Sequence, residues 1–192
     1  MSVKETLLGA IAGTNRGLLA SAHTRGHIER TVAQLEAQSP LTEPLQSLEL
    51  NGVWRLLYTT SQELLQIDQF PLFKLGQIYQ CVFTETATIY NIAEVRGLPY
   101  LDGIISVSAT FTPVSPLRVN VAFNRAVFGL QRLLDYQSPA QLVEQMRAGS
   151  LTAIDFPIRR DDQRGWLEVT YLDADLRVGR GNAGSLFVLS KV

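Results

Sequence analysis

The sequence of 192 residues contains a single cysteine, Cys81, and only two histidines. One cysteine excludes an intrachain disulfide and any zinc or iron–sulfur site built from several cysteines. An excess of charge is missing too, because 17 basic and 18 acidic residues give a net charge of −1. Non-specific binding to nucleic acid relies on positive charge, so we expect no nucleic-acid partner. We also predict no metal ion and no cofactor.

Long apolar runs are absent as well. No stretch reaches the roughly 18 consecutive apolar residues that a membrane-spanning helix needs. Residues 1–17 lack the basic start and long apolar centre of a signal peptide, and they hold too little arginine and serine for a transit peptide. Hydrophobic residues make up 46% of the chain and charged residues 18%, which is typical of a folded globular chain.

The first forty residues have a helical pattern. Apolar residues recur at helical spacing in two stretches: Val3, Leu7, Leu8 and Ile11, and then Ile28, Val32 and Leu35. Pro40 and Pro44 end this part, and the apolar period then changes to two. We therefore predict an N-terminal helical segment over 1–44 and a second unit over 45–192.

The second unit alternates polar and apolar residues in short stretches. The candidate strands are 51–60, 76–83, 86–95, 103–113, 117–124, 165–173, 175–180 and 185–192. Only two short helices are expected among them, one after Thr60 and one that begins at Ser138-Pro139 and stops at Gly149. About eight strands without strand–helix alternation predict a mainly β chain, either an antiparallel barrel or a sandwich.

Three motifs have a structural explanation that we favour over a chemical one. Gly179–Gly184 matches GxGxxG, but a strand follows it, so we expect turn glycines with positive φ rather than a dinucleotide site. His23 and His27 have helical metal-ligand spacing without an evident third ligand, which favours a solvated helix face. Cys81 lies in a strand pattern, where a buried, inert thiol is expected.

Acidic pairs offer two further candidates. Asp161-Asp162 lies between Arg159-Arg160 and Gly165 and indicates a charged hairpin turn. Asp173 and Asp175 lie close to Arg177, and two carboxylates could do acid–base work. A turn in which an arginine pairs with the carboxylates is the interpretation that we favour.

Gly52 and Trp54 form a GxW motif at the start of the first strand. In lipocalin barrels a tryptophan in this place lies across the closed end, and a late arginine packs over its ring. Arg177 and Arg180 are the candidates for that arginine, held by a cation–π contact.

Residues 165–191, GWLEVTYLDADLRVGRGNAGSLFVLSK, closely resemble the carboxy-terminal signature of the plastid-lipid-associated protein family, also called fibrillins or plastoglobulins. LNGVWRLLYTTS at 50–61 resembles the other well-marked segment of that family, and 76–80, 91–95 and 128–137 are similar in placement. The resemblance implies a lipocalin-like fold and an association with thylakoids and lipid droplets in cyanobacteria and plastids. It also implies that Trp54 is the lipocalin-type tryptophan and that Asp173 or Asp175 occupies a late acidic position that contacts ligand.

We therefore predict a lipocalin-like antiparallel barrel without catalytic activity that binds or carries a small lipophilic molecule, such as a carotenoid, quinone or fatty acid. We expect it at or near photosynthetic membranes: cytoplasmic or peripheral to the thylakoid membrane in a cyanobacterium, or in a plastid if the chain is a processed form. The alternatives are a tetrapyrrole chromophore lyase and an interaction scaffold for an isoprenoid or quinone biosynthetic enzyme. The predicted ligand contacts are Trp54, Tyr58, Phe111, Phe123, Asp173, Asp175 and Arg177, with Leu56, Ile105, Val107 and Val121 as further candidates for the wall.

Overall fold

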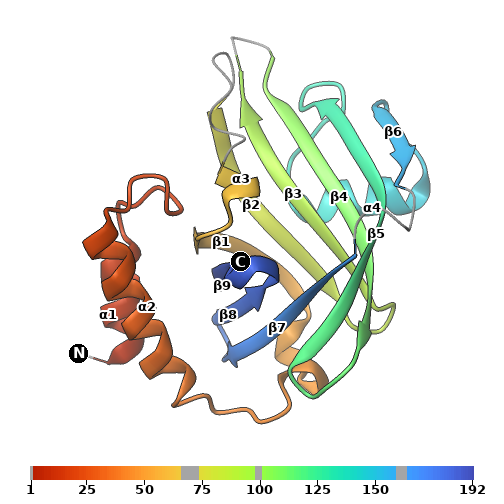
Figure 1. Ribbon diagram of the computed structural model, residues 1–192. Helices are drawn as coiled ribbons and strands as arrows, with labels where there is room; N and C mark the ends of the chain where they lie inside the picture. Colours follow the sequence, from red (N-terminus) through yellow and green to blue (C-terminus); the bar gives the residue numbers. More distant parts are fainter. Residues whose placement is uncertain (1, 66–73, 98–100, 159–163) are drawn as a thin grey trace.

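The computed structural model describes residues 2–65, 74–97, 101–158 and 164–192 (Figure 1). These residues contain nine antiparallel strands in one sheet. The strands are β1 (Gly52–Thr59), β2 (Lys74–Phe83), β3 (Thr88–Arg96), β4 (Gly103–Pro113), β5 (Arg118–Leu130), β6 (Ile154–Pro157), β7 (Arg164–Leu172), β8 (Leu176–Gly181) and β9 (Leu186–Lys191).

The sheet closes into a ring of eight strands, because β4 pairs with both β3 and β5. The order around the ring is β1-β2-β3-β4-β5-β7-β8-β9, with β9 pairing back to β1. The ninth strand, β6, pairs with the same edge of β5 as β7 does, but farther along the strand. β7 pairs with Arg118–Ala122, and β6 pairs with Arg125–Phe128. The prediction of a mainly β, barrel-like chain is confirmed, and β6 is the strand that the sequence pattern did not predict.

The helices lie outside the ring (Figure 1). They are α1 (Val3–Ile11), α2 (Ala22–Glu36), α3 (Gln62–Leu65) and α4 (Pro139–Ala148), with short 3-10 turns η1 (Pro44–Gln46), η2 (Leu48–Leu50) and η4 (Asn182–Gly184). Ser138 caps α4 and Gly149 ends it, as predicted. The helical pattern of the first forty residues is confirmed by α1 and α2, while the domain boundary after residue 44 stays a prediction.

Three apolar clusters hold these layers together. The ring core fills the inside of the sheet and is formed by Leu50, Trp54, Leu56, Leu75, Ile78, Val82, Ile89, Ala93, Phe111, Val119, Val169, Leu172 and Leu189. The helix-pair core joins α1 and α2 to the outer face of β7, β8 and β9, and includes Leu7, Ile28, Tyr171 and Val188. The α4 core joins α4 to the outer face of β2, β3, β4 and β5, and includes Cys81, Ile92, Val127 and Leu142.

A β-bulge in β1 places Tyr58 outside the ring, so its prediction as an inner wall residue is wrong. Leu56 pairs with Leu189 but Tyr58 pairs with Val188, which leaves one extra residue on β1. The alternation shifts by one position there. Leu56 therefore belongs to the ring core, while Tyr58 belongs to the helix-pair core.

The loop between α1 and α2 links β1 to β2 where their pairing has ended. The β1–β2 register covers only Gly52 to Arg55 on β1. Farther along, the carbonyl oxygen of Arg16 accepts a hydrogen bond from the backbone of Thr59 at 3.0 Å, and its guanidinium donates to the carbonyl of Leu75 at 2.8 Å. Gly17 permits this approach, because it has φ +107° and a Cβ there would lie 2.3 Å from the oxygen of Thr59.

The glycine-rich stretch 179–184 lies in the β8–β9 hairpin, as expected. The predicted reason for its glycines, a positive φ, applies to only one of them. Gly184 has φ +72°, whereas Gly181 is extended with φ −136°. Added Cβ atoms at Gly179 and Gly181 would lie 3.1 Å from the carbonyl of Glu168 and from the ring of Phe187. Close packing therefore accounts for these two positions. In the part of the chain that is described, no helix has the length and apolar character needed to cross a membrane.

Candidate functional site

One end of the ring, called here the closed end, is covered by η1 and η2 and contains Trp54. Trp54 is fully buried, and its indole nitrogen donates a hydrogen bond of 3.0 Å to the carbonyl of Leu50. The Arg177 guanidinium carbon lies 4.9 Å from the indole ring centre, a cation–π distance. The predicted packing of a late arginine over the Trp54 ring is confirmed, and Arg177 is that arginine. The role of Trp54 as a ligand contact stays a prediction.

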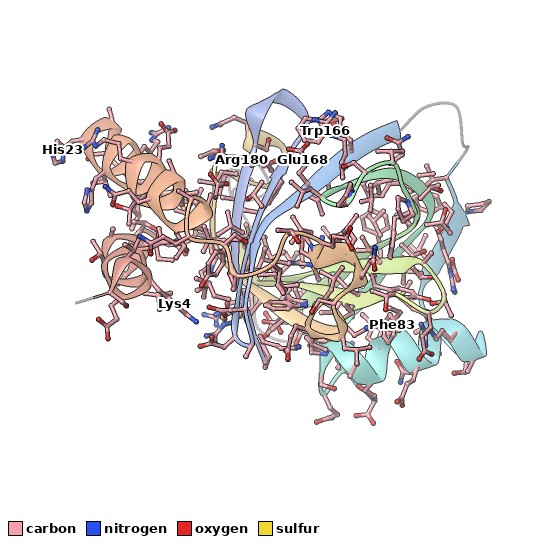
Figure 2. The ribbon with its side chains drawn as sticks, turned by 90° about the horizontal axis from the view of Figure 1, so that it is seen from below. Lys4, His23, Phe83, Trp166, Glu168 and Arg180 are labelled. Atoms are coloured by element: carbon pink, nitrogen blue, oxygen red, sulfur yellow. The ribbon has the colours of Figure 1, made fainter. Side chains whose placement is uncertain are left out.

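Arg180, the other candidate, lies elsewhere. It is on the outer face of β8 and makes two hydrogen bonds of 2.8 Å to the carboxylate of Glu36 on α2. Figure 2 shows Arg180 beside Glu168, its partner across the β7–β8 register, and away from the ring core. Side chains along a strand alternate between its two faces, and Arg177 and Arg180 are separated by an odd number of positions. Their side chains therefore lie on opposite faces of the sheet.

A polar chain crosses the ring interior next to Trp54. Arg177 donates a hydrogen bond to the amide oxygen of Gln80 on β2, and the Gln80 amide nitrogen donates one of 2.8 Å to Asn91 on β3. Arg177 is only 2% exposed. Burial lowers the pKa of its guanidinium from 12.5 to about 9, so it remains charged at neutral pH. Gln80 and Asn91 were not predicted from the sequence, although each lies between apolar inward positions of its strand.

The closed end is filled by side chains. The cavity that remains beside Arg177 measures about 10 Å³ and is lined by Leu45, Leu50, Val82, Ile89, Phe111, Val119, Leu167, Val169 and Arg177. That volume is close to the minimum for one water molecule. Phe111, a predicted ligand contact, is part of this packing and 8% exposed. The closed end therefore has no room for an apolar ligand as it stands.

The inner face changes character toward the opposite end. β4 and β5 have 11 and 13 residues, whereas β8 and β9 across the ring have six each. At about 3.3 Å per residue, β4 and β5 are longer by roughly 17 to 23 Å. Among the residues that the structure describes, part of their inner face therefore has no strand opposite it.

The side chains of this longer part are apolar and accessible. We call them the upper apolar face: Ile105, Val107, Phe123, Phe128, Ile154 and Phe156. Phe128 pairs across strands with Ile105, which packs on the ring core, and with Ile154 of β6, so all three share the inner face. The rings of Phe128 and Phe156 are stacked, with their centres 5.8 Å apart. Phe128 is 37% exposed, Phe156 is 44% exposed and Ile154 is 70% exposed.

Asp173 and Asp175 do not pair with Arg177, and that prediction is wrong. They lie in the β7–β8 turn, where both carboxylates form ion pairs with the ammonium of Lys4 on α1. Asp173 also accepts hydrogen bonds from the Tyr171 hydroxyl and from the backbone of Leu176, both at 2.7 Å. The hydrogen bonds from Lys4 and Tyr171 outweigh the effect of burial and hold the pKa of Asp173 well below its usual range. The carboxylates therefore fix the turn and α1.

The remaining candidates have the structural placements that the sequence favoured. His23 and His27 are exposed on α2, where Figure 2 shows His23 pointing away from the ring. Cys81 is buried in the α4 core, and burial raises the pKa of its thiol to about 12. Within the described ranges, no group of three or more His, Cys, Asp or Glu side chains could hold a metal ion. The predicted turn at Asp161-Asp162 lies outside the described residues.

Comparison with known proteins gives consistent matches over almost the whole chain. The family model PAP_fibrillin matches residues 1–190. The chain is 34% identical to "Light-induced protein, chloroplastic" of Solanum tuberosum and to "Chromoplast-specific carotenoid-associated protein, chromoplastic" of Cucumis sativus; each alignment covers 98% of this chain and 67% of the relative. It is 33% identical to "Plastoglobulin-1, chloroplastic" of Pisum sativum over 98% of this chain and 60% of the relative. No solved structure gives a significant match.

Proposed function

Since the chain belongs to the PAP_fibrillin family, we propose that it has a lipid-associated, non-enzymatic role and that it binds the apolar part of a small lipophilic molecule on its upper apolar face. A carotenoid, a quinone and an acyl chain are the candidate ligands. Names of relatives support the lipid association: one is carotenoid-associated, one is a plastoglobulin, and others are plastid lipid-associated proteins.

One observation carries this proposal: apolar side chains on the inner face of the sheet are left accessible at one end. Phe128, Phe156 and Ile154 expose large apolar groups side by side, whereas the inner residues of the closed end are buried. Contiguous apolar surface of this kind indicates a binding site. Burying about 300 Å² of ligand surface at about 25 cal/mol/Å² yields roughly 7–8 kcal/mol before the costs of ordering. We therefore expect micromolar affinity at best.

The predicted ligand contacts divide accordingly. Phe123 is half-buried on the inner face and stays a predicted contact. Trp54, Phe111 and Arg177 belong to the filled closed end. We propose that their packing stabilises the strands that carry the upper apolar face. Asp173 and Asp175 hold Lys4 outside the ring, and we assign them no orienting role toward ligand.

The test is a titration of the full chain with a fluorescent fatty acid, paired with mass spectrometry of the chain after incubation with a thylakoid lipid extract. Phe128→Glu and Phe156→Glu place a charge on the upper apolar face and should weaken binding about tenfold or more, since burial of one such ring contributes about 1.5–3 kcal/mol. Val114→Glu and Leu19→Glu are matched controls, because these side chains are 52% and 72% exposed on other surfaces. Equal binding by all variants, or no retained lipid in the wild type, would contradict the proposal.

A second candidate function, the interaction scaffold, is favoured by the edge position of β6. Among the described residues β6 pairs only with β5, and all four of its residues are exposed. An exposed strand edge can pair with a strand of another chain. Co-purification of one isoprenoid or quinone biosynthetic enzyme with a wild type that binds no lipid would favour this function. The tetrapyrrole lyase alternative predicts a visible absorbance band with bilin.

The relatives' names also bear on location. The three compared above are plastid proteins by name. We propose a plastid or photosynthetic compartment for this chain as well, with peripheral contact to a lipid surface. Fractionation of the source cells into soluble, thylakoid and lipid-droplet fractions tests this, and recovery of the chain away from every photosynthetic membrane fraction would contradict it.

A further inference from the structure

A second hollow lies on the outer surface, at the closed end and away from the upper apolar face. It measures about 400 Å³ and is lined by Leu48, Asn51, Phe83, Glu85, Thr86 and Arg147. They come from η2 and the residue that follows it, from the end of β2 and the β2–β3 turn, and from the last turn of α4. Phe83 packs on the α4 core, and Figure 2 shows it between the sheet and α4. The hollow is therefore separate from the ring interior.

Arg147 presents an oriented charge to this hollow. Its guanidinium carbon lies 4.0 Å from the ring centre of Phe83 and 5.7 Å from that of Tyr90. Its Nε donates a hydrogen bond of 3.4 Å to the Tyr90 hydroxyl, which leaves the two terminal nitrogens for other partners. None of the ion pairs among the described residues includes Arg147. A guanidinium held in this way offers the paired donors that oxyanions prefer.

Asn51 adds a neutral donor. Its side-chain oxygen accepts hydrogen bonds of 2.8 Å from both the backbone nitrogen and the hydroxyl of Thr84. These bonds fix the orientation of the amide, so its NH2 group points away from Thr84. That NH2 group makes no hydrogen bond within the part of the chain that is described. Asn51 and Arg147 both line the hollow, together with the hydroxyl-bearing Thr86.

We propose that this hollow binds an oxyanion, a phosphate, sulfate or carboxylate group, with Arg147 as its charged contact and Asn51 as a neutral donor. Glu85 is the only carboxylate among the lining residues, and it opposes anion binding and limits the affinity. Leu48, 86% exposed, lies on the same hollow and can contact an apolar chain attached to the anion. The oxyanion is either free in solution or the headgroup of an anionic lipid.

The experiment has two arms, both with the full chain. In the first, inorganic phosphate is titrated while the NMR signals of the Asn51 side-chain amide and of the Arg147 Nε–H are followed. In the second, co-sedimentation is measured with vesicles of phosphatidylcholine alone and of phosphatidylcholine mixed with phosphatidylglycerol. Shifts with phosphate alone identify a free-anion site, and binding to the mixed vesicles identifies a lipid headgroup.

Arg147→Gln removes the charge and should weaken binding about fivefold, as expected for one basic residue beside an anionic surface. Arg147→Lys keeps the charge, checks the fold and should lose less. Arg132→Gln is the matched control, because Arg132 is also exposed but lies beyond β5. Glu85→Gln should strengthen binding. Equal effects of Arg147→Gln and Arg132→Gln, or no response in either arm, would overturn the proposal. Neither result depends on the upper apolar face, whose own variants test the lipophile site.

Discussion

The two ends of the ring interior are lined by similar apolar residues, yet they are filled very differently. At the closed end Trp54 is fully buried, and only about 10 Å³ of space remains beside Arg177. At the other end Phe128 and Phe156 are 37% and 44% exposed. The difference follows from the strands: all eight enclose the closed end, but only the longer ones continue beyond it.

This difference separates stability from binding within one sheet. Side chains at the closed end exclude water from each other, so they contribute to the free energy of unfolding. Side chains of the upper apolar face remain accessible, so their apolar surface is available to a ligand. We expect substitutions at the closed end to act on stability and substitutions at the upper face to act on binding.

The largest effect is expected for Trp54→Ala. Loss of a buried tryptophan leaves a cavity and should lower the free energy of unfolding by about 3–5 kcal/mol. Chemical denaturation followed by circular dichroism measures it. Trp166→Ala is the control, because Trp166 is half-buried on the outer face, under the guanidinium of Arg118. A loss for Trp54→Ala no greater than for the control would break the contrast.

Arg177→Met should have the next largest effect, a loss of about 1–3 kcal/mol. It removes the cation–π contact with Trp54 and leaves the half-buried Gln80 side chain without the donor to its amide oxygen. Arg180→Met loses the ion pair with Glu36, whose side chains are 38% and 18% exposed, and should cost less than about 1 kcal/mol. Chemical denaturation of both variants measures the two losses in the free energy of unfolding. A larger loss for Arg180→Met than for Arg177→Met would show that the stability of the closed end does not depend on Arg177.

Phe156→Ala should cost only about 0.5–1 kcal/mol, because the residue is accessible and loses chiefly its stacking on Phe128. Binding of the fluorescent fatty acid should fall clearly in the same variant. A thermal melt and a ligand titration on one sample measure both quantities. If stability falls sharply while binding is unchanged, the upper apolar face is part of the folding core and the two ends are alike.

The smallest effect is expected for Tyr58→Phe, a substitution in the helix-pair core, outside the ring. The buried Tyr58 hydroxyl has no hydrogen-bond partner among the described residues, so its removal should leave stability unchanged or raise it by up to about 1 kcal/mol. Tyr171→Phe is the control, since its hydroxyl donates to Asp173 at 2.7 Å and its loss should destabilise the chain. Destabilisation by Tyr58→Phe to the same degree would reveal a partner for that hydroxyl.

Local patterns predicted much of the fold because they depend on neighbouring residues only. The alternation over 103–113 coincides with β4, and its Ile105, Val107 and Phe111 do face inward. Ser138 and Pro139 begin α4 as expected, since capping is a local property. The placement of Trp54 was predicted from GxW together with its resemblance to lipocalins. Short segments of the chain were therefore sufficient for these parts of the fold and the site.

The sequence by itself therefore determined the mainly β class, the helical first forty residues, the tryptophan at the closed end and the inert cysteine. Tertiary structure alone decided that Tyr58 faces outward, that Asp173 pairs with Lys4 and not Arg177, and that β6 extends the sheet. Each of these depends on pairing between segments far apart in the chain. A bulge exists only relative to a partner strand, an ion pair depends on which elements pack together, and an exposed inner face requires the opposite strands to end early.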